Sequence, residues 1–308
     1  MRVETTTKAV RDAEVPLPPH LRRYGGTTTA RLYGTAGPVV VALGGISADR
    51  RVCEWWAGLA GAGRALDPAR LRLVGLDFAA DPVGAVAPST AEQAEVLAAA
   101  LDALGLGRAD LVVGASYGGM VALALAKRRP ERVRRLAILC APAVPHAAAT
   151  AMRELQRRTV AMGLALGSGA EALSIARGLA MTTYRTAEEF AERFEGGIRE
   201  PGVLATSAPG AYLRARGDAY RAVMSPERFL SLSASIDRHR VDPASIPHPA
   251  LVIGARSDRL VPPEQVEALA AALPDAELHL LDSRYGHDSF LKEIDRIGPL
   301  LARFLEAA

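Results

Sequence analysis

The stretch that decides the fold reads Asp110-Leu111-Val112-Val113-Gly114-Ala115-Ser116-Tyr117-Gly118-Gly119. Its β-branched first half predicts a buried strand, and the segment 118–129 predicts a helix that stops before Pro130. Between them, residues 114–118 fit the pattern G-x-S-x-G, in which small residues on both sides of the serine permit a sharp turn from strand to helix. In this setting the pattern predicts that Ser116 is a nucleophile. The alternative is an incidental serine in a glycine-rich turn.

Strands and helices alternate on both sides of this turn. Short apolar runs predict further strands at 38–43, 71–77, 136–140, 250–254 and 277–281, with helices at 90–104, 263–273 and 290–305. Apolar runs that are buried on both faces and separated by helices indicate a mostly parallel sheet.

The alternation breaks in the middle of the chain. From about Pro145 to Arg240 the sequence shows helical segments and few strand signals. We therefore divide the chain into an α/β core, residues 1–144 and 241–308, and a helical insertion, residues 145–240. Such an insertion would lie over the carboxyl ends of the strands, where open α/β sheets bind ligands.

Composition narrows the class of protein. Hydrophobic residues make up 49% of the 308 residues and charged residues 23%, which favours a packed globular core over disorder. The net charge is only +3 and forms no basic stripe, so nucleic acid is not expected as a partner. No apolar run reaches the roughly 18 residues of a membrane span, and residues 1–19 lack the apolar stretch of a secretory signal. A cytoplasmic protein without a membrane anchor is expected.

Neither a metal nor a disulfide is expected. The two cysteines, Cys53 and Cys140, lack metal-ligand spacing and are too few for a disulfide framework.

A serine nucleophile needs a base, and the base needs a third group that holds its tautomer. Asp258 follows the strand 250–254 and His287 follows the strand 277–281, so both lie at the same sheet edge as Ser116. The chain order Ser, Asp, His predicts an α/β-hydrolase fold, a mostly parallel sheet with a helical lid insertion. Asp282, which also ends a strand, is the rival for the acid and reads more simply as a turn residue.

Other histidines compete with His287 for the role of base. None of them follows a strand in the last segment of the chain: His20, His146, His239, His248 and His279. His287 is therefore the predicted base.

An oxyanion hole needs two backbone N–H groups aimed at the developing charge. One is expected from Tyr117, the residue after the nucleophile, and the other from Ile46 in the loop Gly44-Gly45-Ile46-Ser47-Ala48. The alternative is that the two glycines only form a tight turn.

Three segments together resemble the homoserine O-acyltransferases, enzymes of methionine biosynthesis with an α/β-hydrolase core. They are Gly44 to Ser47, Gly114 to Met120 and Gly286-His287-Asp288-Ser289-Phe290-Leu291. The insertion adds 176–185, 189–194 and 233–237, which are similar to that family's lid. The resemblance covers about residues 25–305.

The resemblance implies roles for three more residues. Arg177 matches the arginine that holds the homoserine carboxylate, Tyr184 matches a lid tyrosine at the substrate, and Asp288 matches the acid that pairs with the homoserine ammonium. Without the family, Arg177 reads as a solvated helix charge and Asp288 as a helix N-cap. The resemblance also implies a homodimer joined through the lid helices, acyl-CoA as a co-substrate, and no bound cofactor.

The acyl donor is the most open point. Acetyltransferases of the family often carry His-Ala-Leu-Thr-Gly where this chain has 44–48, and Met or Leu in place of Tyr117, so the chain looks more like the succinyl-CoA branch. A succinyl carboxylate needs a cation or several N–H donors. Arg50 and Arg51 directly follow the oxyanion loop, so we expect one of them to contact that carboxylate; both would otherwise be solvated or paired with Asp49 or Glu54.

We therefore predict a homoserine O-succinyltransferase with an acyl-serine intermediate. The alternatives are a homoserine O-acetyltransferase, a serine O-acyltransferase, an esterase of the same fold, and a non-catalytic scaffold, which usually lacks a member of the triad.

Overall fold

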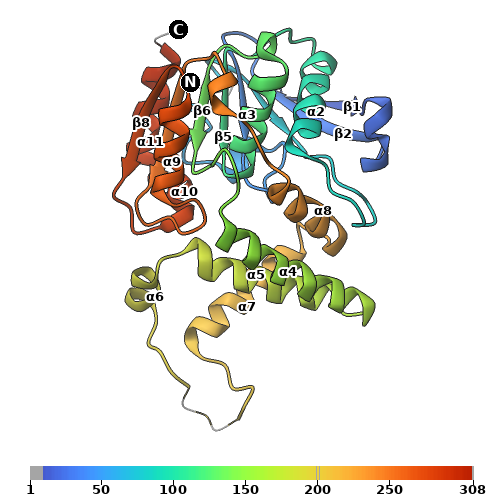
Figure 1. The fold of residues 1–308 in the computed structure, drawn as a ribbon, viewed down its shortest axis with the longest axis vertical. Helices are drawn as coiled ribbons and strands as arrows, with labels where there is room; N and C mark the ends of the chain where they lie inside the picture. The colour runs from blue at the N-terminus through green and yellow to red at the C-terminus, as the bar shows by residue number, and fades with distance from the viewer. Residues whose placement is uncertain (1–9, 199, 201, 307–308) are drawn as a thin grey trace, which may run out of the picture.

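The structure is a computed structural model that describes residues 10–198, 200 and 202–306, so the first nine residues of the polar N-terminal stretch lie outside it. Within the described residues, eight strands form one sheet in the order β1-β2-β4-β3-β5-β6-β7-β8 (Figure 1). The strands are β1 (Val10–Pro16), β2 (Thr27–Tyr33), β3 (Val39–Leu43), β4 (Arg72–Leu76), β5 (Leu111–Ala115), β6 (Leu136–Leu139), β7 (Ala250–Ala255) and β8 (Ala276–Leu281).

The central sheet is parallel, as predicted. β3 pairs with β4 and β5, and the parallel pairing continues through β6 and β7 to β8. The prediction missed β1 and β2, which add an antiparallel edge beside β4. Because both faces of the central strands are covered, β3, β5, β6 and β7 are buried along their whole length.

Helices cover both faces of the sheet. One face carries α2 (Thr90–Ala103), α3 (Tyr117–Arg128) and α9 (Pro263–Ala272), and the other carries α1 (Val52–Trp55), α10 (Ser289–Lys292) and α11 (Ile294–Glu306). Alternation along β3 supplies both layers: Val39 and Val41 pack with the first set, and Val40 packs with the second. Short 3₁₀ turns lie at η1 (Pro19–Tyr24), η2 (Pro130–Arg132), η3 (Pro243–Ser245) and η4 (Gly286–Asp288).

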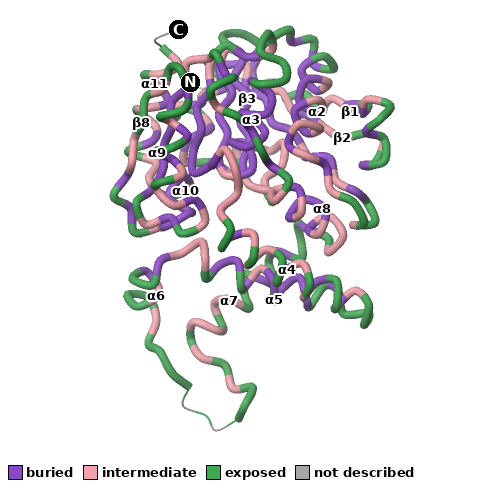
Figure 2. The backbone as a smooth tube through the Cα atoms, viewed as in Figure 1, coloured by how far each residue is buried: buried purple, intermediate pink, exposed green. Residues whose placement is uncertain are grey.

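Among the described residues, five helices lie between β6 and β7 and form a separate group below the sheet (Figure 1). They are α4 (Ala147–Ala165), α5 (Gly169–Tyr184), α6 (Ala187–Arg193), α7 (Ala208–Arg221) and α8 (Pro226–Asp237). α5 packs between α4 and α7, and it also contacts η4 of the core. Figure 2 shows that burial is concentrated in the sheet, whereas the connection between α6 and α7 is largely exposed.

Hydrogen bonds join α8 to the core near Ser116. The Ser231 hydroxyl donates to the carbonyl of Val86 at 2.8 Å and accepts from the amide of Asp81 at 3.0 Å. Farther along the helix, Ser235 Oγ lies 2.5 Å from the Tyr117 hydroxyl. α8 is thereby fixed to the residue that follows Ser116.

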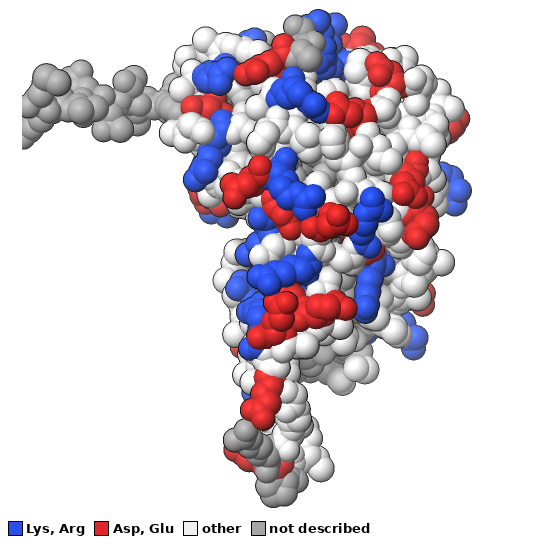
Figure 3. Space-filling model, turned by 90° about the vertical axis from the view of Figure 1, so that its left-hand side faces the viewer, with Lys and Arg blue, Asp and Glu red and all other residues white. Residues whose placement is uncertain are grey.

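Oppositely charged side chains form ion pairs at many places on the described surface. Arg284 on the core, for example, lies 2.7 Å from Glu192 of α6. On the face shown in Figure 3, basic and acidic side chains are interspersed, and no continuous basic stripe follows the surface. That face therefore offers no track for a phosphate backbone.

In the described part of the chain, no helix is both long and apolar enough to cross a membrane. Nor do three or more His, Cys, Asp or Glu side chains there come together in a way that would hold a metal ion.

Candidate active site

Ser116 lies at the turn between β5 and α3 with φ 53° and ψ −120°, a backbone conformation that costs about 1–3 kcal/mol for a residue other than glycine. The surroundings hold it there, since the Ser116 amide donates to the carbonyl of Leu139 at 2.8 Å. A Cβ atom on Gly114 would collide with the backbone of Gly118, and one on Gly118 would collide with Leu43. The small residues of the pattern are therefore required by close backbone contacts.

His287 joins Ser116 to Asp258. His287 Nε2 lies 2.8 Å from Ser116 Oγ, and His287 Nδ1 lies 2.7 Å from Asp258 Oδ2. The other carboxylate oxygen of Asp258 accepts from the amides of Leu260 and Val261 at 2.8 and 3.0 Å, which fixes its orientation. The structure thus brings the three predicted residues into one hydrogen-bonded chain, with the geometry that a serine nucleophile and its base require.

Electrostatics suit His287 to accept a proton. Burial of the imidazole opposes its charged form, but the charge of Asp258 and its hydrogen bond outweigh burial and raise the pKa of His287 above its ordinary value. Asp288, the next residue, acts in the same direction. The site therefore stabilises the imidazolium that forms when Ser116 gives up its proton.

The predicted oxyanion loop lies directly beside this turn. The amide of Gly118 donates to the carbonyl of Gly44 at 2.9 Å, and the amide of Ala48 closes a turn on Gly45 at 2.9 Å. Ile46 and Tyr117 both line the cavity that holds Ser116. Both predicted donors therefore belong to residues that line the cavity of Ser116, and their role in an oxyanion hole stays a prediction.

The Tyr117 side chain points away from this cavity into the core. It packs edge-on against Phe78, with ring centroids 4.8 Å apart, and its hydroxyl meets Ser235 of α8. Burial raises the pKa of the Tyr117 hydroxyl, which keeps it neutral. Only the backbone N–H of Tyr117 was predicted to have a role, and the contact of its side chain with α8 was not predicted.

A cavity of about 150 Å³ opens on Ser116 between the core and the helices above it. The residues expected at the substrate all line it: Ile46, Tyr117, Arg177, Tyr184, His287 and Asp288. The Tyr184 ring lies 5.7 Å from the His287 ring. Residues from β3, β5, α5 and η4 therefore meet in one place, as the predicted edge of the sheet requires.

Arg177 presents an unused guanidinium to this cavity. Its charge lies 5.2 Å from the ring centre of Tyr184 and 4.8 Å from that of Tyr220, so two aromatic faces support it. Among the described residues, no hydrogen bond or ion pair engages the Arg177 side chain. Its N–H donors are therefore available to an anion.

Asp288 is buried, lines the same cavity and is already near a cation. Arg185 Nε lies 2.8 Å from Asp288 Oδ2, although no hydrogen bond forms at that nitrogen, while Arg185 Nη1 donates to Glu189 at 2.5 Å. Asp288 occupies the N-cap position of α10 but makes no capping hydrogen bond. The structure thus does not support the alternative of a simple helix cap. Arg185 ends the segment 176–185 that resembles the family's lid, and no role was predicted for it.

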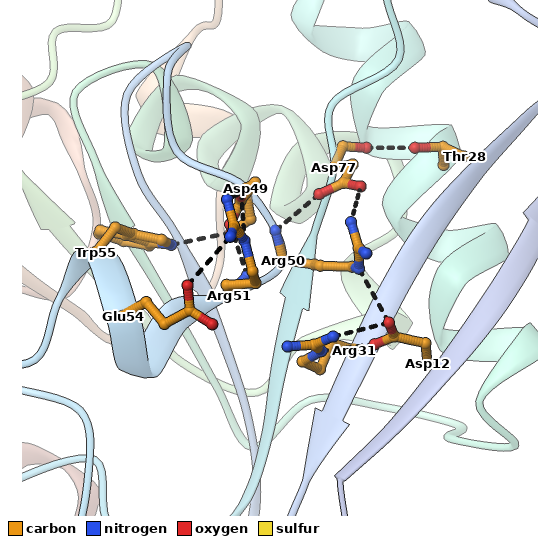
Figure 4. A network of polar contacts seen from close by, with 9 residues as sticks. All are labelled: Asp12, Thr28, Arg31, Asp49, Arg50, Arg51, Glu54, Trp55 and Asp77. Carbon is orange, nitrogen blue, oxygen red and sulfur yellow. Dashed lines mark hydrogen bonds and ion pairs between the residues drawn. The ribbon is translucent and has the colours of Figure 1, made fainter. Parts of the chain in front are cut away.

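Neither Arg50 nor Arg51 lines the cavity of Ser116, where one of them was expected to contact the acyl carboxylate; Arg51 lines a neighbouring cavity together with its partners Asp49 and Glu54. Arg50 Nη1 lies 2.6 Å from Asp77 and Arg50 Nε lies 3.2 Å from Asp12. Arg51 is bound to Asp49 at 2.6 Å and to Glu54 at 3.2 Å (Figure 4). Both guanidinium groups already have carboxylate partners within the protein.

The fold and the Ser–His–Asp arrangement define an α/β hydrolase, and the chain matches the family described as alpha/beta hydrolase fold over residues 38–294. It is 42% identical over 298 residues to a homoserine O-succinyltransferase of Xanthomonas campestris pv. campestris, covering 92% of this chain and 81% of that protein. It is 34% identical to a homoserine O-acetyltransferase of Deinococcus radiodurans, covering 89% and 85%. The chain belongs to the homoserine O-acyltransferase family.

Solved structures show the same fold at lower identity. A homoserine O-acetyltransferase from Bacillus anthracis matches with a TM-score of 0.86 and 15% identity, covering 97% of this chain and 98% of that one. Esterase E22 matches with a TM-score of 0.83 and 19% identity, covering 96% and 99%. Because transferases and esterases share this architecture, the fold alone does not select between transfer and hydrolysis.

Proposed function

We propose that the protein is an L-homoserine O-succinyltransferase of methionine biosynthesis, which converts succinyl-CoA and L-homoserine to O-succinyl-L-homoserine and CoA. One observation carries the proposal: an unpaired cation, Arg177, and a buried carboxylate, Asp288, line the same cavity as Ser116. These two charges match the carboxylate and ammonium of an amino acid. An enzyme that transfers acyl groups only to water has no need of them.

The mechanism has two half-reactions. Ser116 Oγ attacks the thioester carbon while His287 takes the serine proton; the C–S bond breaks, the proton passes to the sulfur, and CoA leaves an acyl-Ser116 ester. The homoserine hydroxyl then gives its proton to His287 and attacks the ester, and Ser116 recovers the proton as the product leaves. Asp258 orients His287 in both steps, and the amides of Ile46 and Tyr117 bind the oxyanion. The scheme uses no metal or bound cofactor.

Replacing the nucleophile tests the mechanism. Ser116→Ala removes the only atom that forms the ester, so mass spectrometry should detect no acylated protein after incubation with succinyl-CoA. Wild-type protein should acylate without homoserine and show ping-pong kinetics with it. Near-normal transfer by Ser116→Ala would contradict the assignment.

One set of assays distinguishes the alternative acceptors and acyl donors. Homoserine, serine and water are compared as acceptors, each with succinyl-CoA and acetyl-CoA, by following CoA release. Turnover that depends on homoserine supports transfer, whereas equal turnover without an acceptor favours an esterase. Serine lacks one methylene, which is worth about 1–3 kcal/mol of discrimination.

We also propose that the protein works as a cytoplasmic homodimer joined through its helical lid. The lid helices α4 and α5 leave apolar side chains exposed, among them Leu155, Met162, Leu166 and Ile175. Pairing two lids would cover these side chains. Light scattering at micromolar concentration tests this, and a strictly monomeric protein would reject it.

A further inference from the structure

A second cavity of about 290 Å³ adjoins the cavity of Ser116. The two cavities share Ile46, Ser47, Ala48 and Trp55 in their walls, so they lie on either side of the predicted oxyanion loop. α8 closes the second cavity with Arg228, in its first turn. An acyl chain on Ser116 begins next to this loop.

Arg228 lacks a partner. Its backbone amide is bound to Ser225, but among the described residues its guanidinium makes no hydrogen bond or ion pair. The nearby carboxylates are already engaged, because Asp77 binds Arg50 and Asp49 binds Arg51 (Figure 4). Burial lowers the pKa of Arg228, in the direction expected when a desolvated cation has no adequate counter-ion. An unpaired arginine at a cavity wall favours an anionic ligand.

We propose that Arg228 binds the terminal carboxylate of the succinyl group and thereby selects the acyl donor. This inference rests on the proposed function and replaces Arg50 and Arg51 in the role expected for them. A succinyl group carries its carboxylate two methylene groups beyond the reactive carbonyl carbon, and the two cavities share the loop beside Ser116. The phosphates of CoA are separated from the sulfur by the pantetheine arm, so contact with them would affect both donors alike. An acetyl group would leave Arg228 unpaired.

The test is the ratio of kcat/KM with succinyl-CoA to kcat/KM with acetyl-CoA, measured with homoserine as acceptor. Arg228→Met keeps much of the side-chain volume and removes the charge. It should lower the ratio by about 10²- to 10³-fold, the effect of removing one partner of a desolvated charge pair. Arg228→Lys should keep part of the ratio, because it retains a cation but loses the planar fork.

Arg238→Met is the matched control. Arg238 is an exposed arginine at the opposite end of α8, where it donates to the carbonyl of Ala87, and it lines neither cavity. This variant should leave the donor ratio unchanged. Thermal unfolding of all variants separates a loss of fold from a loss of selectivity. If Arg228→Met does not fold, the donor ratio of Arg228→Lys tests the proposal instead.

Each remaining outcome has one meaning. A parallel loss with both donors would overturn the proposal and indicate contact with CoA itself. An unchanged ratio in both Arg228 variants would overturn it as well. Wild-type protein that uses acetyl-CoA and not succinyl-CoA would refute the donor in the proposed function, and with it the inference, before any variant is compared. Wild-type protein that transfers from neither donor to homoserine would refute the proposed function instead, a result visible before any Arg228 variant is compared.

Discussion

Two groups of arginines lie close to the loop 44–51 and differ in their partners. Arg31, Arg50 and Arg51, at the β1–β2–β4 edge and the start of α1, are bound to Asp12, Asp77, Asp49 and Glu54. Arg177 on α5 and Arg228 on α8 each line a cavity, and among the described residues neither guanidinium is paired with a carboxylate. The first group neutralises charges inside the protein, and the second is available to neutralise charges that a substrate brings.

The comparison shows that proximity along the chain is a poor guide to function for an arginine. Arg50 and Arg51 follow the oxyanion loop directly, yet their charges are used within the fold. Arg228 is far away in sequence and lies across the same loop. An arginine that the protein leaves unpaired is the better candidate for a ligand contact, because a buried cation without a partner is costly.

The largest expected effect concerns the buried pair of Asp258 and His287, which serves the chemistry directly. Asp258→Asn keeps the shape of the side chain but no longer holds His287 in the tautomer that accepts the serine proton. We expect kcat to fall by about 10⁴-fold, with an unchanged fold by circular dichroism. A loss of less than tenfold would mean that His287 is oriented by another group.

Arg177 tests the unpaired group at the acceptor. Arg177→Met should lower kcat/KM for homoserine by about 10²- to 10³-fold, because the acceptor carboxylate loses its partner. Acylation of Ser116 by succinyl-CoA without homoserine should proceed as in the wild type, since that half-reaction involves no acceptor. Rapid-quench mass spectrometry measures both, and slower acylation would show that Arg177 acts on the donor instead.

Arg50 tests the paired group, and its effect should be on stability. Arg50→Met leaves Asp77 without its ion pair at a partly buried position, so the free energy of unfolding should fall by about 1–2 kcal/mol. The ratio of succinyl-CoA to acetyl-CoA use should not change. Urea denaturation and the donor assay check the two claims. A changed donor ratio would show that a paired arginine also affects the choice of donor, contrary to the comparison.

The smallest expected effect is the pH dependence of the stability that the Asp12–Arg31 ion pair contributes. Hydrogen bonding to Arg31 lowers the pKa of Asp12 from 3.8 to about 2, so its contribution is present above about pH 4 and is lost as the pH falls towards 2. The Asp12 side chain is 38% exposed, so solvent screening limits the gain to below about 1 kcal/mol. The stability difference between wild type and Asp12→Asn should shrink over this interval in urea titrations; a difference that stays constant would contradict the pairing.

The sequence predicted those elements that a short run of neighbouring residues is enough to identify. β3, β5, β6 and β7 are continuous apolar runs, and Ser116 sits in a pattern that only a tight strand-to-helix turn requires. β1 and β2 were missed because an antiparallel edge strand is buried on one side only: Thr27-Thr28-Thr29-Ala30-Arg31 has no apolar run to mark it.

The site was predictable only in part, for a similar reason. Ser116, Asp258 and His287 each follow a strand, so their convergence follows from the topology of a parallel sheet. The engagement of Arg50 depends on Asp12 and Asp77, which come from other strands and whose distances the sequence does not contain. The same holds for the contact between Tyr117 and Ser235, which joins residues far apart along the chain.

The anchoring of α8 to the core has a consequence for how this family can diversify. Arg177 and Tyr184 line the cavity of Ser116 from α5 and Asp288 lines it from η4, whereas Arg228 lies on α8, which Ser231 and Ser235 join to the core. Under the proposed roles, the residues that bind the acceptor and the residue that binds the donor lie on different elements. A graft of residues 147–221 from a relative that keeps α8 and η4 of this chain should then change the acceptor preference through α5 and leave the donor preference unchanged.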